Sequence, residues 1–256
     1  MPKNTEVEDE TISSDPSIEA QQSYWDDRWG SQRSPNEWQI RRAEAILDIL
    51  KSCPIDNPRI LDLGCATGWM TSRLAELGEA EGVDLSEAAI AMARSQFPGI
   101  LFTAGDLYEV PLTSEPVDIV VCQEVIAHVS DPKGLIERIA HVIKPGGYLV
   151  ITSANKLVMH RMRFSDGIVG VGPEDPDEHI KKWLGMRDLK LLVKPLFKIL
   201  YSTSVIPLGN RGLLRIVNSP KLNWVLASFL TVRRVEALKE RLGFGYTIIV
   251  LGQKQP

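Results

Sequence analysis

The stretch from Arg59 to Gly68 constrains the fold of this chain more than any other, because it joins an apolar strand pattern, a glycine turn and the start of a helix. Its first five residues are mostly apolar, as in a strand buried within a parallel sheet. Gly64 and Gly68 supply the backbone freedom that a sharp turn and a closely approaching ligand require. Open α/β sheets bind small molecules at the carboxyl ends of their strands, so this loop predicts a ligand site.

The acid of this loop argues against a dinucleotide-binding fingerprint. Asp62 lies two residues before Gly64, and Trp69 occupies a position where that fingerprint requires a glycine. A loop that seats a pyrophosphate on a helix N-terminus would not obviously place a carboxylate beside it. A carboxylate instead suits a ligand with a positive charge, such as an α-ammonium group.

Five segments of the chain, in sequence order, resemble the motifs of the class I S-adenosylmethionine-dependent methyltransferase family. They are residues 59–71, 82–86, 104–107, 117–125 and 135–149. The resemblance is close over residues 24–155 and limited to architecture elsewhere. Ala66 departs from the family pattern, which commonly has glycine at this position.

The resemblance implies an α/β fold with a doubly wound seven-stranded sheet, a Rossmann-like methyltransferase fold in which strand seven is antiparallel, with helical lid insertions. The alternation of strand and helix patterns independently predicts a doubly wound sheet. The predicted strands are Arg59–Leu63, Ala80–Asp84, Ile100–Ala104, Val117–Cys122, Tyr148–Ser153, Phe197–Ile206 and Tyr246–Leu251. The predicted helices are Ser17–Asp27, Glu37–Cys53, 70–77, Ser86–Gln96, Pro132–Val142, Arg187–Lys194 and Lys221–Arg241.

Composition and length predict a short tail followed by one domain. Residues 1–17 are polar and acidic and are expected to be disordered. Residues 18–256 are expected to form a single methyltransferase domain. Within it we predict an N-terminal helical cap over 18–53, a cofactor-binding core over 59–153, and an acceptor-binding and lid region over 155–245.

The cysteines and the hydropathy of the chain indicate an ordinary cytoplasmic protein. Cys53, Cys65 and Cys122 are far apart and match neither a disulfide framework nor a zinc pattern, so no metal site is expected. The first residues contain no apolar signal region, and no run approaches the roughly 20 apolar residues of a membrane span.

The resemblance implies that the loops after the strands bind S-adenosylmethionine. Asp84 would accept hydrogen bonds from both ribose hydroxyls, although it could instead only cap the next helix. Asp106 and the backbone of Leu107 would bind the adenine, although Asp106 could instead only form a turn. The other core residues expected at the cofactor are Asp62, Gly64, Cys65, Ala66, Gly68, Leu85 and Gln123.

An aromatic and charged segment precedes the sheet. By the same resemblance, Tyr24, Trp29 and Arg41 would cover the methionine arm of the cofactor. The alternative is that the aromatic side chains only dock this helix on the core.

Glu124 and His128 are the catalytic candidates. The segment around them is similar to one of the quinone-biosynthesis O-methyltransferase group, in which a glutamate and a histidine lie near the transferable methyl. The two residues are one helical turn apart, so they could share a helix face. His128 would take a proton from an acceptor hydroxyl or amine, or it would only pack and cap the following turn.

The carboxyl third of the chain is basic, although the whole chain has a net charge of −4. Residues 155–241 carry sixteen bases and eight acids, and apolar residues are interleaved with the cations. Such a lid suits an anionic or lipophilic acceptor, or contact with a membrane surface, although solvated helix faces are the plainer explanation. The expected acceptor-binding residues are Met159, Arg163, His179 and Trp183.

Together these features predict an S-adenosylmethionine-dependent methyltransferase that acts on an oxygen or nitrogen of a small molecule, in secondary-metabolite or quinone biosynthesis. No nucleic-acid partner is expected, because no RNA-binding module is recognisable. The alternatives are an RNA methyltransferase and a non-catalytic S-adenosylmethionine-binding protein of the same fold. Tight, salt-sensitive RNA binding would favour the first alternative.

Overall fold

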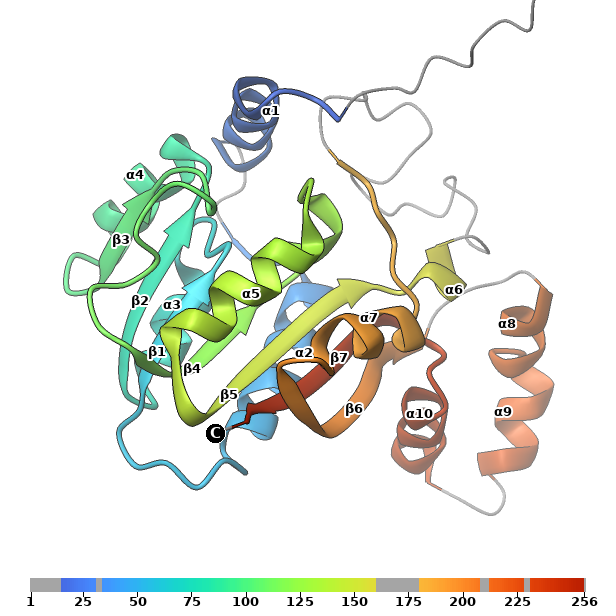
Figure 1. Ribbon diagram of the computed structural model, residues 1–256. Helices are drawn as coiled ribbons and strands as arrows, with labels where there is room; N and C mark the ends of the chain where they lie inside the picture. The colour runs from blue at the N-terminus through green and yellow to red at the C-terminus, as the bar shows by residue number, and fades with distance from the viewer. Residues whose placement is uncertain (1–14, 31–33, 160–179, 208–211, 228–230, 256) are drawn as a thin grey trace, which may run out of the picture.

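A computed structural model describes residues 15–30, 34–159, 180–207, 212–227 and 231–255 (Figure 1). Seven strands form one sheet: β1 (Arg59–Leu63), β2 (Glu79–Asp84), β3 (Leu101–Ala104), β4 (Val117–Cys122), β5 (Ile143–Ala154), β6 (Phe197–Pro207) and β7 (Gly245–Lys254). Their order is β3-β2-β1-β4-β5-β7-β6. Strand β7 runs antiparallel to both β5 and β6, and the other neighbouring strands pair in parallel. The predicted fold class is confirmed.

Helices precede, connect and flank the strands. They are α1 (Ile18–Gly30), α2 (Glu37–Leu50), α3 (Trp69–Leu74), α4 (Glu87–Gln96), the 3-10 helix η1 (Ile126–His128), α5 (Pro132–Val142), α6 (Lys156–Met159), α7 (Met186–Val193), α8 (Gly212–Val217), α9 (Pro220–Ala227) and α10 (Val232–Arg241). None of the helices within the described ranges is long and apolar enough to cross a membrane.

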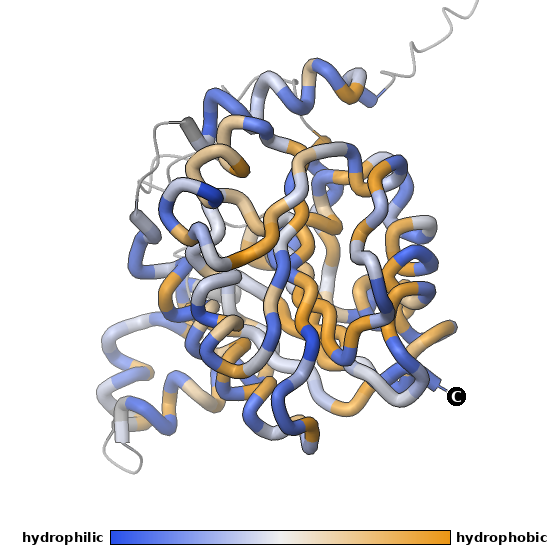
Figure 2. The backbone as a smooth tube through the Cα atoms, turned by 90° about the vertical axis from the view of Figure 1, so that its left-hand side faces the viewer, coloured by the Kyte–Doolittle hydropathy of each residue, from blue (hydrophilic) through white to orange (hydrophobic). Residues whose placement is uncertain are grey.

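The apolar side chains of the sheet pack into two main clusters on its opposite faces. Ile60 belongs to the cluster that α2 and α3 cover, whereas its neighbour Leu61 belongs to the cluster that α5 and α7 cover. This alternation is the two-residue period of a strand buried on both faces. Figure 1 shows α5 and α7 in front of the sheet and α2 behind it, and Figure 2 shows the hydrophobic residues gathered in the central strands.

Most predicted boundaries lie within three residues of those in the structure. Helix α3 ends at Leu74 and continues only as a turn. Strand β5 begins at Ile143 rather than Tyr148, because Ile143 already pairs with Val117 of β4. The single helix predicted near the carboxyl end is two helices, α9 and α10, and the side chain of Thr231 caps the second by accepting the Arg234 N–H.

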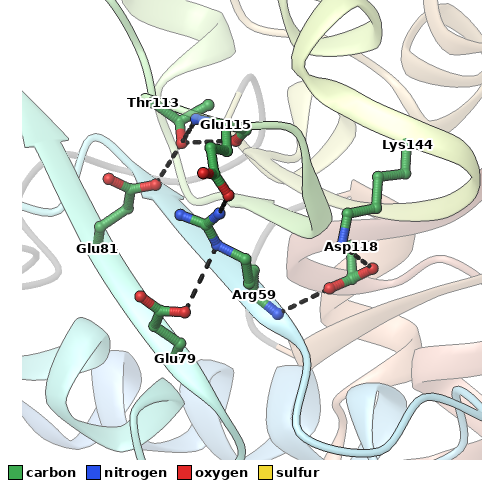
Figure 3. A network of polar contacts seen from close by, with 7 residues as sticks. All are labelled: Arg59, Glu79, Glu81, Thr113, Glu115, Asp118 and Lys144. Carbon is green, nitrogen blue, oxygen red and sulfur yellow. Dashed lines mark hydrogen bonds and ion pairs between the residues drawn. The ribbon is translucent and has the colours of Figure 1, made fainter.

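Charged side chains link the amino ends of the parallel strands (Figure 3). The predicted ligand loops follow the opposite, carboxyl ends of these strands. The Asp118 carboxylate accepts the backbone N–H of Arg59, at 2.9 Å, and the Lys144 ammonium, at 2.8 Å. The Arg59 guanidinium pairs in turn with Glu79, at 3.5 Å, and with Glu115. Asp118 therefore links the starts of β1, β4 and β5.

Replacing Asp118 with Ala should lower the free energy of unfolding by about 1–2 kcal/mol, because it leaves a strand-end N–H and a lysine without their acceptor. Replacing Glu79, whose side chain is 72% exposed, should change it by less than about 0.5 kcal/mol. Urea unfolding of both variants checks this expectation. Equal destabilisation by the two changes would contradict the role given to Asp118.

Candidate functional site

A cavity of about 380 Å³ opens at the carboxyl ends of β1, β2 and β4. Helix α1, the loops after these strands and η1 form its walls. In Figure 1, α1 lies beyond the carboxyl ends of β2 and β3, at the top of the molecule. The cavity is therefore at the position where open α/β sheets bind ligands.

The loop after β1 turns through left-handed backbone at three positions. Gly64 and Gly68 both have φ of +77°, and Ala66 has φ of +47°. A Cβ on Gly64 would lie 2.1 Å from the Val125 side chain, so this position excludes any larger residue. The left-handed backbone of Ala66 costs about 1 kcal/mol, because its Cβ is crowded in this conformation. The family commonly has glycine at this position.

The Asp84 carboxylate holds this loop in place. It accepts the Ala66 N–H at 2.8 Å with one oxygen and the Ser86 N–H at 2.9 Å with the other. Burial raises the pKa of Asp84, and these two hydrogen bonds oppose the rise. Capping of α4 was the alternative role for Asp84, but Ser86 caps this helix instead. The Ser86 hydroxyl accepts the Ala89 N–H at 3.0 Å. Asp84 lines the cavity, and its carboxylate fixes both the loop after β1 and the start of α4.

Asp62 is almost fully buried at the end of β1. One carboxylate oxygen accepts the Thr71 hydroxyl at 2.7 Å. The other, Oδ1, is buried without a hydrogen-bond partner among the described residues. Burial raises the pKa of Asp62 to about 7, and the nearby Asp84 adds to the rise. An oxygen of this kind on a cavity wall is suited to a hydrogen-bond donor on a ligand.

Asp106 and Leu107 line the cavity after β3. The Asp106 side chain accepts the Tyr108 N–H at 2.9 Å, so it forms the turn that was the alternative to adenine binding. The two roles are compatible, since a carboxylate has several acceptor sites.

Glu124 and His128 do not share a helix face. Glu124 has φ of +57°, and η1 begins only at Ile126. The Glu124 carboxylate accepts the Thr152 hydroxyl at 2.9 Å and lies 3.6 Å from the Arg42 guanidinium. The prediction that Glu124 and His128 share a helix face is therefore wrong, although both side chains line the cavity.

The environment of His128 determines its tautomer. Its Nδ1 lies 2.6 Å from the Ile180 carbonyl oxygen. Because a carbonyl only accepts hydrogen bonds, the neutral ring carries its proton on Nδ1 and its lone pair on Nε2. The ring meets the indoles of Trp25 and Trp183 edge to face, with centroids 5.2 and 5.8 Å away.

Most of the predicted site residues come together in the cavity. Those that line it are Trp29, Asp62, Gly64, Cys65, Ala66, Asp84, Leu85, Asp106, Leu107, Gln123, Glu124 and His128. Five other described residues do not line it, namely Tyr24, Arg41, Gly68, Met159 and Trp183. Arg163 and His179 lie outside the described residues.

The structure corrects the prediction for Arg41 and adds residues to the site. Arg41 pairs with Glu236 and Glu240 of α10, each at 3.7 Å, whereas its neighbour Arg42 lines the cavity. The lining residues that were not predicted include Gln21, Trp25 and Tyr108. Gln21 and Trp25 recur with Trp29 at intervals of four, a helical spacing that would have identified this face of α1.

Comparison with known proteins agrees with this geometry. A family model described as a methyltransferase domain matches residues 61–151. The ubiquinone biosynthesis O-methyltransferase of Cereibacter sphaeroides is 28% identical over 197 residues, which cover 72% of this chain and 74% of that protein. Residues 61–151 thus match a methyltransferase domain, and the chain is similar to proteins named as O-methyltransferases.

Two further proteins are similar to this chain, one in sequence and one in fold. The ubiquinone biosynthesis O-methyltransferase of Albidiferax ferrireducens is 28% identical over 158 residues, covering 57% of this chain and 61% of the relative. The crystal structure of the N-methyltransferase NodS from Bradyrhizobium japonicum, in complex with S-adenosyl-L-homocysteine, matches the fold with a TM-score of 0.62 at 17% identity, covering 93% of this chain and 99% of that one.

The residues of the cavity fit S-adenosylmethionine. Asp62 Oδ1 is a buried acceptor without a partner among the described residues, which suits an ammonium group. Gly64 lines the cavity, and its left-handed backbone turns the loop after β1 at the cavity wall. Asp84, at the end of the second strand, is placed to accept hydroxyl hydrogens, as the equivalent acid does in nucleotide folds.

The affinity of the protein for S-adenosylhomocysteine should depend on pH through Asp62. Below about pH 7 this carboxyl is protonated and must release its proton to pair with the α-ammonium group, so affinity should fall by up to about tenfold per pH unit. In the Asp62→Asn variant this dependence should be lost, whereas Asp56→Asn, at an exposed position, should retain it. Calorimetric titrations from about pH 5.5 to 8 measure the effect, and identical pH profiles for all three proteins would contradict it.

Proposed function

We propose that this methyltransferase transfers the methyl group of S-adenosylmethionine to an oxygen of a small-molecule acceptor. The observation that carries the proposal is the hydrogen bond from His128 Nδ1 to the Ile180 carbonyl, at 2.6 Å on the cavity wall. It leaves the lone pair on Nε2, as a general base requires. The relatives named ubiquinone biosynthesis O-methyltransferase support oxygen as the accepting atom.

The cofactor supplies a methyl group already activated by a sulfonium. Asp84 would hold the ribose hydroxyls, and Asp106 with the Leu107 backbone would hold the adenine. Asp62 would accept a hydrogen bond from the ammonium group. Arg42 would take the place at the methionine arm that the sequence assigned to Arg41.

Catalysis would then rest mainly on alignment, with His128 in an assisting role. The acceptor hydroxyl would give its proton to Nε2 as its oxygen forms the bond to the methyl carbon, and the bond from that carbon to sulfur would break, which leaves S-adenosylhomocysteine and a protonated imidazole. The indoles of Trp25 and Trp29 would exclude water and orient the acceptor, which lowers the entropic barrier of a two-molecule reaction.

Within the described part of the predicted acceptor region 155–245, Ile180 and Lys182 contact η1, whose His128 lines the cavity. Ile180 holds His128, and the Lys182 N–H donates to the Ala127 carbonyl at 2.7 Å. Helix α10 instead packs on β6 and α9, at the edge of the sheet away from α1 (Figure 1). We propose that the acceptor enters between α1 and η1, where its apolar part meets aromatic side chains.

Replacing His128 with Gln should lower kcat roughly 10²-fold, because the amide cannot accept a proton in the transition state. The affinity for S-adenosylhomocysteine should stay within about twofold, since the change leaves the cofactor acids in place. The matched control is His141→Gln on the exposed face of α5, which should leave kcat unchanged. Equal turnover by wild type and His128→Gln would contradict the role of a base.

The assay uses S-adenosylmethionine with a labelled methyl group, and catechol, aniline and transfer RNA as acceptors. Transfer to catechol supports the proposal. Transfer only to aniline would identify an N-methyltransferase, and transfer only to RNA would identify the RNA alternative. Binding of S-adenosylhomocysteine without any transfer would favour the non-catalytic alternative.

A further inference from the structure

Helix α1 is fastened to the amino end of α4 by one carboxylate. Asp26 Oδ1 accepts the Ser86 hydroxyl at 2.6 Å and the Ala88 N–H at 3.0 Å. The two helices pack against each other over this contact. A residue of the N-terminal segment thus reaches the loop that follows β2.

The contact is favourable for reasons of helix chemistry. The first N–H groups of a helix have no partner within it, and its amino end carries a partial positive charge. Ser86 satisfies the Ala89 N–H, and Asp26 satisfies that of Ala88. Hydrogen bonds to an ionised carboxylate are among the stronger ones in proteins. Asp26 therefore completes the cap of α4 from another helix.

This contact lies directly beside the acid assigned to the ribose. Ser86 donates its backbone N–H to Asp84 and its hydroxyl to Asp26. Ser86 thus connects Asp84, in the wall of the cavity, to Asp26 of α1. The cover is formed by α1, whose Trp25 and Trp29 line the cavity.

We propose that Asp26 is a positioning residue that latches α1 over the cofactor cavity. The proposal rests on the assignment of this cavity to S-adenosylmethionine. Affinity for a ligand falls in proportion to the fraction of protein in the competent state, so an unlatched α1 weakens cofactor binding without any change in the acids below. A second link, from Asp15 to Lys182 at 2.7 Å, fastens the start of the cover. Both its side chains are 40% exposed, so it holds α1 less firmly.

The test compares three variants by calorimetric titration with S-adenosylhomocysteine. Asp26→Ala should bind at least about tenfold more weakly than wild type. Asp26→Asn keeps an acceptor oxygen, so its affinity should lie between those of wild type and Asp26→Ala. The matched control is Asp27→Ala, one position further along α1 and exposed, which should bind within about twofold of wild type. Equal affinities for wild type and Asp26→Ala would overturn the proposal.

A second measurement keeps the latch testable apart from the cofactor. Hydrogen exchange of ligand-free protein should be several-fold faster over residues 18–30 in Asp26→Ala, and unchanged over β4. Because no ligand is present, this result does not depend on the cofactor or on any acceptor. Unchanged exchange in α1 would overturn the latch even if the cavity binds S-adenosylhomocysteine. Equally faster exchange throughout the sheet would also overturn it, because the effect would then be a general loss of stability.

Discussion

The buried carboxylate of Asp84 holds together the parts of this molecule on which the rest of the site depends. Its two oxygens accept N–H groups from Ala66, in the loop after β1, and from Ser86, before α4. Burying an acid is costly unless it is hydrogen-bonded, and these donors offset that cost. The same interaction fixes the loop, the helix and the acid, so the cofactor meets a surface that is already organised.

The fold and the cavity-lining residues at the ends of the strands could be predicted because their signals are local. Strands β1 and β4 have the predicted bounds, since apolar runs between turn residues mark both ends. Helix α4 ends at the predicted Gln96 and begins one residue after its predicted start. To choose between Arg41 and Arg42, one must know which face of α2 points inward. Arg42 lies four residues before the buried Ile46, so the two residues share the inward face of this helix.

Contacts between distant segments could not be predicted from one sequence. No pattern links Asp26 to Ser86, or His128 to Ile180, because each pair depends on how separate elements pack. The same holds for Glu124, whose left-handed backbone replaced the expected helical turn. These long-range contacts shape the cover and the acceptor side of the cavity, where enzymes of one fold differ in substrate.

The most direct test of this account is the affinity of S-adenosylhomocysteine for wild type and for Asp84→Ala. The account predicts that the variant loses about 1.5–3 kcal/mol of binding free energy, because charge-assisted hydrogen bonds to the ribose are removed. Circular dichroism establishes that the variant is folded. An unchanged affinity in folded protein would contradict the central claim, since it would remove Asp84 from the cofactor site.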